Sequence, residues 1–169
     1  MDKVKHTVIG GNTLIELVGV VSDVPAKVDT GADSSAIWAS EVSVDEHGTL
    51  HYVLFDRKSP FYNGTIYKTK QFTVASVLSS TGHREIRYRV SLPTRIANRR
   101  VRVQFNLSNR ATHKFPVLIG RRTLKNKFIV DVAQQTIKVP TTRTHELNKE
   151  MQENPHAFFQ KYHQSKRNK

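Results

Sequence analysis

Apolar residues occupy every second position from Val101 to Leu107, and polar residues occupy the positions between them. Side chains alternate between the two faces of a β-strand, so this pattern predicts a strand with one buried and one exposed face. A helix would instead repeat its apolar residues three and four positions apart. The pattern therefore requires a partner against which the apolar face can pack, and it indicates a core built on a sheet.

Similar short apolar runs recur through the first 140 residues, and turn-forming residues separate them. These runs are residues 7–9, 14–21, 26–28 and 35–39, whereas residues 85–90 alternate apolar with charged side chains. Residues 115–119 are apolar almost throughout and end at Gly120, which is typical of a fully buried strand. A short helix within residues 121–127 and a last strand over residues 128–130 complete the pattern. Many short strands bounded by Gly, Pro, Asp and Ser predict an all-β fold, either a small barrel or a sandwich.

Two hairpins are expected in the middle of the chain. Asn63-Gly64 is a good turn signal between the two halves of residues 49–77, which predicts one long hairpin. A second turn over residues 79–83 separates residues 74–78 from residues 85–90 and predicts another.

The character of the sequence changes after Pro140. Residues 144–153 have a helix-forming composition, and Asn154-Pro155 predicts the N-cap and first-turn proline of a further helix. We therefore expect a domain over residues 1–140, followed by a basic, partly helical tail over residues 141–169.

Charge is the strongest signal in the overall composition. The chain has 27 Lys and Arg against 14 Asp and Glu, a formal net charge of +13. The tail from Thr141 to Lys169 holds six basic and three acidic residues, so most of the excess lies on the domain. A basic surface favours anionic partners such as nucleic acid, an anionic membrane surface or an acidic peptide, although it can also serve solubility alone. No motif of a known nucleic-acid-binding fold supports the first of these.

Several classes of protein are disfavoured by what the sequence lacks. The chain has no cysteine, which excludes disulfides, cysteine nucleophiles and thiolate metal sites. No apolar run approaches the roughly 20 residues that a membrane-spanning helix needs. Residues 1–11 lack the apolar segment of a secretory signal. We expect a cytoplasmic protein with no membrane partner.

The most informative motif is Asp29-Thr30-Gly31-Ala32, which directly follows the apolar run of residues 26–28. Such a motif displays a carboxylate on a tight turn, where glycine lets a backbone amide approach the carboxylate closely. The threonine supplies a hydroxyl that can hold the turn to its neighbour. On its own, this four-residue string also occurs in ordinary turns.

A second motif strengthens the first. The apolar run that ends in Gly120-Arg121 lies 91 residues after Asp29, and the turn around Gly82 lies between them. This set resembles the retropepsin-type aspartic proteases, which have a catalytic Asp-Thr-Gly-Ala, a flap hairpin, and then an aliphatic strand ending in Gly-Arg before a short helix. The resemblance implies an all-β fold, a small closed barrel of retropepsin type with one short helix, followed here by the helical tail.

A closer resemblance covers roughly residues 14–135. The strings Lys27–Ala32, Ser80–Glu85 and Leu118–Arg121, continuing to Asp131, are similar in order to a bacterial and archaeal family labelled ATP-dependent zinc proteases, whose fold is retropepsin-like. Asp33 departs from that family, which often carries a basic residue there, and is closer to the retroviral pattern.

The resemblance implies a role for each matching residue. The catalytic residues would be Asp29, Thr30 and Gly31. The substrate-binding residues would be Ala32, Asp33 and, on the expected flap, Ser80, Gly82 and His83. Gly120 and Arg121 would support the site, with Asp33 and Arg121 forming an ion pair beneath it.

The family's label finds no support in the residues themselves. ATP use would need a phosphate-binding Gly-x-x-x-x-Gly-Lys-Ser/Thr loop, and zinc proteolysis usually shows His-Glu-x-x-His; the sequence has neither. His47 and His51 are four residues apart, but Gly48 and Thr49 between them indicate a loop rather than a helix face. We therefore expect no metal and no cofactor.

Aspartic proteolysis needs two carboxyl groups about 3 Å apart that share one proton. The chain has one Asp-Thr-Gly motif, so this chemistry predicts a homodimer in which Asp29 meets its copy on the two-fold axis. Asp131 lacks a following Thr-Gly and is interpreted as structural. Ala32 replaces the serine of pepsin-like enzymes and removes a possible hydrogen bond to the carboxylate, which predicts a less acidic pH optimum.

The sequence thus predicts a homodimeric aspartic endopeptidase. Some relatives of the family are associated with RimK-type glutamate ligases, and together with the positive charge this suggests acidic, glutamate-rich peptides as substrates. Arg84, Arg87 and Arg89 near the flap are candidates to contact them. The alternative is a binding module with the same fold that holds acidic protein or nucleic acid without cleaving it.

Overall fold

The computed structural model describes residues 6–78, 82–138 and 142–164. The chain divides into two compact units, Met1–Ile137 and Lys138–Lys169. The first unit is built almost entirely of strands and the second of helices. Among the described residues, no helix has both the length and the apolar character needed to cross a membrane.

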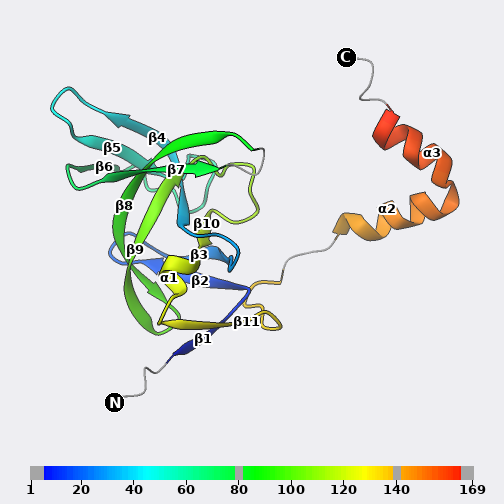
Figure 1. Ribbon diagram of the computed structural model, residues 1–169, viewed down its shortest axis with the longest axis horizontal. Coiled ribbons are helices and arrows are strands. Elements are labelled where there is room, and N and C mark those ends of the chain that lie inside the picture. The colour runs from blue at the N-terminus through cyan, green and yellow to red at the C-terminus, as the bar shows by residue number, and fades with distance from the viewer. Residues whose placement is uncertain (1–5, 79–81, 139–141, 165–169) are drawn as a thin grey trace. The chain divides into compact units, whose positions relative to one another are not determined.

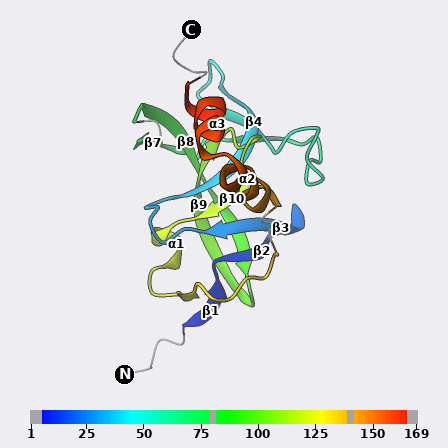
Figure 2. The same cartoon turned by 90° about the vertical axis from the view of Figure 1, so that its right-hand side faces the viewer.

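Six strands of the first unit close into a barrel (Figure 1 and Figure 2). Around it they follow the order β10-β3-β2-β8-β9-β4, and β4 pairs back with β10. They are β2 (Asn12–Leu17), β3 (Val21–Val28), β4 (Ser35–Val44), β8 (Arg84–Ile96), β9 (Arg99–Ser108) and β10 (Val117–Ile119). The expected all-β barrel is therefore confirmed.

The remaining strands extend or flank this barrel. In sheet order, β5 (Leu50–Leu54) and β6 (Ile66–Thr69) continue outward from β4, and β7 (Thr73–Leu78) pairs with β8. Two strands distant in sequence, β1 (Thr7–Gly10) and β11 (Phe128–Asp131), form a separate parallel pair. The one short helix of this unit, α1 (Arg121–Leu124), follows β10 directly.

The alternation in residues 101–107 explains how the barrel is filled. Val103 and Phe105 of β9 are 1% and 0% exposed, whereas Gln104 between them and Arg102 before them are exposed. The apolar face of β9 therefore lies in the core, together with Ile37 and other aliphatic residues. Because this burial of apolar area drives folding, the strand predicted from its pattern is also a main contributor to the core.

The arrangement of β10 positions the candidate site. It lies between β3 and β4, parallel to the first and antiparallel to the second. Because β3 and β4 are consecutive along the chain, the loop of residues 29–34 that joins them must pass around the end of β10. The motifs Asp29-Thr30-Gly31 and Gly120-Arg121 are therefore brought to the same place in the fold.

The single long hairpin expected over residues 49–77 is wrong. β6 pairs with β5, but β7 leaves this sheet and pairs with β8 over its whole length. The Oγ1 of Thr69 accepts a hydrogen bond from the Gln71 backbone N–H at 2.9 Å, a local turn that ends β6 and separates it from β7. The expected second hairpin, formed by β7 and β8, is confirmed.

The second unit is helical, as expected for the tail. It contains α2 (Thr142–Glu153), α3 (Pro155–Phe159) and a short π-helix, η1 (Gln160–Gln164). Asn154 caps α3, its side chain accepting a hydrogen bond from the Ala157 N–H at 3.0 Å, and Pro155 follows in the first turn.

Candidate active site

Asp29 stands at the end of β3 with its carboxylate held by its own loop. Its backbone N–H donates to the Ile119 carbonyl of β10 at 2.9 Å. One carboxylate oxygen, Oδ1, accepts hydrogen bonds from the N–H groups of Gly31 at 3.0 Å and Ala32 at 3.2 Å. The other, Oδ2, lies 4.0 Å from the Lys27 ammonium, and the side chain is 32% exposed. The loop thus fixes one oxygen while the side chain remains accessible.

Glycine at position 31 leaves room for this geometry. A Cβ atom built on Gly31 would lie 3.3 Å from Oδ1 of Asp29, closer than most side chains approach. The amide of residue 31 can donate to the carboxylate at normal distance because nothing crowds it. This agrees with the role that the Asp-Thr-Gly motif suggested for glycine.

Backbone groups at the start of α1, just after β10, hold the loop of residues 29–34 in place. The Arg121 N–H donates to the Ala32 carbonyl at 2.8 Å, and the Arg122 N–H donates to the Asp33 carbonyl at 3.1 Å. These bonds tie the backbone after Asp29 to the start of α1. The structure therefore brings Gly120 and Arg121 together with Asp29, Thr30, Gly31, Ala32 and Asp33.

A buried hydroxyl pair completes the support. The Gly120 N–H donates to Oγ of Ser35 at 3.0 Å, and this Oγ lies 2.8 Å from Oγ1 of Thr123. Both Ser35 and Thr123 are buried. Ser35, the first residue of β4, is thus hydrogen-bonded both to Gly120, which follows β10, and to Thr123 in α1.

The Ser35→Ala substitution is expected to lower the free energy of unfolding by about 2 kcal/mol, because it leaves the buried Gly120 N–H without its acceptor. Urea denaturation measures the change. Ser40→Ala, at an exposed position of the same strand, serves as the matched control. A loss no larger than that of the control would contradict the role assigned to Ser35.

Asp33 forms the expected ion pair with Arg121, and a shorter one that was not expected. Its Oδ1 lies 3.9 Å from the Arg121 guanidinium, and its Oδ2 lies 2.9 Å from Nε of Arg122. All three side chains are more than half exposed. Water screens such a pair, so we assign it less than about 1 kcal/mol of stability.

A buried cation near Asp29 was not predicted from the sequence. Arg110 is 8% exposed, and its Nε donates to the Phe115 carbonyl at 3.1 Å. Burial and the neighbouring Arg87 lower the pKa of Arg110, while the Asp29 carboxylate acts in the opposite direction. Both charged groups therefore lie within electrostatic reach of Arg110. No sequence signal marks this arginine, because residues 109–114 are mostly polar and predict an exposed turn.

His113 belongs to the same electropositive surroundings. Burial lowers the pKa of His113, and the charges of Arg110 and Arg87 lower it further. Arg110 and Arg87, whose charges favour the neutral form of His113, make up what we call the cationic cluster, and Asp29 lies within electrostatic reach of Arg110.

The predicted flap residues lie at the β7–β8 turn. Gly82 has a φ of +81°, a conformation that favours glycine, and His83 precedes β8. Ser80 falls outside the described residues. Figure 1 shows the β7–β8 hairpin projecting on the side of the barrel where β3 ends. The roles of Gly82 and His83 in binding substrate stay predictions.

The other acidic and histidine residues singled out in the sequence have local partners. Asp131 accepts hydrogen bonds from the Ala133 N–H and from Nε2 of Gln134, both at 3.0 Å. His51 contacts Asp45 at 2.8 Å. In the part of the chain that the structure describes, no group of three or more His, Cys, Asp or Glu residues is arranged to hold a metal ion.

Comparisons with known proteins agree with this arrangement. Residues 8–141 match the family model described as "RimB-like: Retropepsin-like aspartic endopeptidase RimB". A Desulfotalea psychrophila protein described as a probable alpha-L-glutamate ligase is 24% identical over 115 residues, which cover 66% of this chain. The match spans only 25% of that protein's length.

The fold also has a counterpart among solved structures. The crystal structure of a Legionella pneumophila protein of unknown function superposes with a TM-score of 0.57 and 20% sequence identity. The match covers 78% of this chain and 97% of the other. With the family model matching the whole barrel and the whole Asp29 loop, the chain belongs to the RimB-like family of retropepsin-like aspartic endopeptidases.

Proposed function

We propose that this protein is an aspartic endopeptidase whose active site is formed by Asp29 together with the partner's Asp29 in a homodimer. The observation that carries the proposal is the state of the Asp29 carboxylate. Two backbone amides hold one of its oxygens, and the side chain stays accessible at the surface of a single chain. One carboxylate cannot both take a proton from water and polarise the substrate carbonyl, so a second one is required.

The proposed reaction uses the two carboxyl groups as a pair that shares one proton. The ionised carboxylate takes a proton from a water molecule, whose oxygen attacks the carbonyl carbon of the peptide bond. The protonated carboxyl donates to the carbonyl oxygen as it gains negative charge. The carbon–nitrogen bond then breaks as a proton passes to the leaving nitrogen. The amides of Gly31 and Ala32 keep the Asp29 carboxylate in place throughout.

Acidic peptides are the substrate class that we propose. Arg110 of the cationic cluster lies within electrostatic reach of Asp29, and the Lys27 ammonium lies 4.0 Å from the Asp29 carboxylate. Such surroundings attract negatively charged segments and disfavour basic ones. The similarity to a probable alpha-L-glutamate ligase fits this choice, because a ligase that adds glutamate makes acidic peptides. The cytoplasmic setting expected from the sequence stays a prediction.

The same cationic surroundings also favour a second candidate function. A barrel of this kind could hold acidic peptides without cleaving them, and the positive charge would serve that role equally well. Cleavage by the wild-type protein distinguishes the two functions. Tight binding of a glutamate-rich peptide that is never hydrolysed would support the binding module.

The dimeric site predicts that activity depends on protein concentration. With a fluorogenic glutamate-rich peptide as substrate, specific activity is expected to fall about tenfold per tenfold dilution once the dimer dissociates. Sedimentation at the same concentrations reports the dimer fraction, which should fall in parallel. Constant specific activity in samples that are fully monomeric would contradict the shared site.

A further inference from the structure

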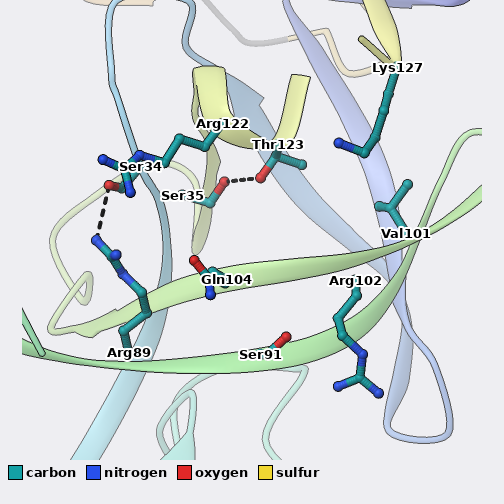
Figure 3. Close-up of a pocket in the computed structure, with 10 residues that line it drawn as sticks. All are labelled: Ser34, Ser35, Arg89, Ser91, Val101, Arg102, Gln104, Arg122, Thr123 and Lys127. Atoms are coloured by element: carbon teal, nitrogen blue, oxygen red, sulfur yellow. Dashed lines mark hydrogen bonds between the residues drawn. The ribbon is translucent and has the colours of Figure 1, made fainter. Parts of the chain in front are cut away.

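A second site lies outside the Asp29 loop, on the polar face of β8 and β9 beneath α1. Figure 3 shows this pocket, whose volume is about 310 Å³. Four of its lining residues are cationic: Arg89, Arg102, Arg122 and Lys127. Serine hydroxyls, including those of Ser34 and Ser91, add polar groups, and no residue of the lining is acidic.

The charge of Arg89 is the first reason to expect an anion here. Its side chain is half-buried, and Figure 3 shows it reaching from β8 toward Ser34. Its Nε donates to Oδ1 of Asn106 at 3.0 Å and its Nη2 to Oγ of Ser34 at 3.3 Å. Both acceptors are neutral, so the guanidinium is fixed in place without a counter-ion. A partly buried cation of this kind favours binding of an external anion.

Two of the other three cations, Arg102 and Lys127, also lack a counter-ion among the residues that the structure describes, whereas Arg122 is paired with Asp33. Within the described ranges, no carboxylate lies within 4.0 Å of a side-chain nitrogen of Arg89, Arg102 or Lys127. The ammonium group of Lys127 donates a hydrogen bond to the carbonyl of Lys125 at 3.3 Å. Four cations around one pocket are therefore balanced by a single carboxylate at its edge.

We propose that this pocket binds a phosphate group, either of free phosphate or of a small phosphorylated molecule. Guanidinium groups offer forked donors that match the geometry of phosphate oxygens, and hydroxyls can donate to the same oxygens. A phosphate dianion also matches several cations better than a single carboxylate does. A bulk water occupies about 30 Å³, so the pocket has room for about ten waters, enough for a phosphate and a small organic group.

The pocket is independent of peptidase chemistry. Its lining includes none of residues 29–33, although it includes Ser34, the last residue of that loop, and Ser35, the first residue of β4. A ligand there would contact the back of the loop that carries Asp29. The proposal therefore concerns binding alone, and its test needs no activity.

The test is a titration of the full-length protein with inorganic phosphate at constant ionic strength, followed by amide chemical shifts. We expect saturation at one site, with the largest shifts at Ser34, Ser91 and Gln104. Arg89→Gln is expected to raise the dissociation constant at least about tenfold, because it removes a charged donor. The control Arg57→Gln makes the same charge change in an exposed loop and should alter it less than about twofold.

A thermal melt checks that Arg89→Gln still folds. If it does not, the Arg102→Gln/Lys127→Gln double variant replaces it, with the same tenfold expectation. Tighter binding of ribose 5-phosphate than of phosphate would assign the site to a phosphorylated molecule, and equal binding would assign it to free phosphate. Unsaturated shifts, shifts elsewhere on the barrel, or equal weakening by Arg57→Gln would overturn the proposal.

Discussion

The Asp29→Asn variant is expected to lose peptidase activity by a factor of about 10⁴ while its barrel stays folded. An amide can neither take a proton from water nor share one with a second carboxyl group. Its oxygen can still accept hydrogen bonds from the Gly31 and Ala32 N–H groups, as Oδ1 of Asp29 does. The substitution therefore removes the chemistry and leaves the loop intact.

Initial rates on a glutamate-rich fluorogenic peptide measure this loss, and a thermal melt checks the fold. Asp131→Asn is the matched control, because it makes the same chemical change at a carboxylate engaged in its own turn. We expect this control to keep its activity. A variant at Asp29 that retains a tenth of the wild-type rate, or a control that loses its activity, would refute the assignment of Asp29 as the catalytic acid.

The strands and the Asp29 loop could be predicted from the sequence because both depend on local rules. The alternation from Val101 to Leu107 fixes which face of β9 is buried, whatever its partners are. The Asp-Thr-Gly order places a carboxylate beside a residue that lacks a Cβ, and the structure uses this for the amide bonds to Asp29. Each inference needed only residues close together in the chain.

Strand pairing could not be predicted in the same way. Periodicity assigns faces to a strand, but it does not say which neighbour the strand bonds to. Residues 66–69 and 73–78 therefore looked like one arm of a hairpin, although they belong to different parts of the sheet. A single turn after Thr69 changes the partner, and this turn has no strong sequence signal.

The positions of the cations also depend on the closed barrel. Arg110 lies in a polar segment that looks exposed, and only the packing of the loop around it makes it a buried neighbour of Asp29. Arg89, Arg102 and Arg122 come from β8, β9 and α1, and they line one pocket only because the barrel closes. Net charge predicted an anionic partner, but it could not distinguish a cluster beside Asp29 from a separate pocket.

Gly120→Ala is expected to lower the free energy of unfolding by about 3 kcal/mol or to prevent folding. A Cβ at this position would lie 2.5 Å from both the carbonyl carbon and oxygen of Ser34 and 3.0 Å from the Ala32 carbonyl oxygen. All three are backbone atoms, so no side-chain rotation can relieve the contact. The loop that carries Asp29 would have to move away from the end of β10.

Gly11→Ala is the matched control, because its new Cβ would meet only the Val132 carbonyl oxygen at 4.0 Å. Urea denaturation of both variants should therefore separate them by at least about 2 kcal/mol. If Gly120→Ala folds with reduced stability, its activity should fall further than its folded fraction explains, because the displaced loop misplaces Asp29. Equal stability of the two variants would mean that the end of β10 does not press against the catalytic loop, and the support described for Asp29 would have to come from elsewhere.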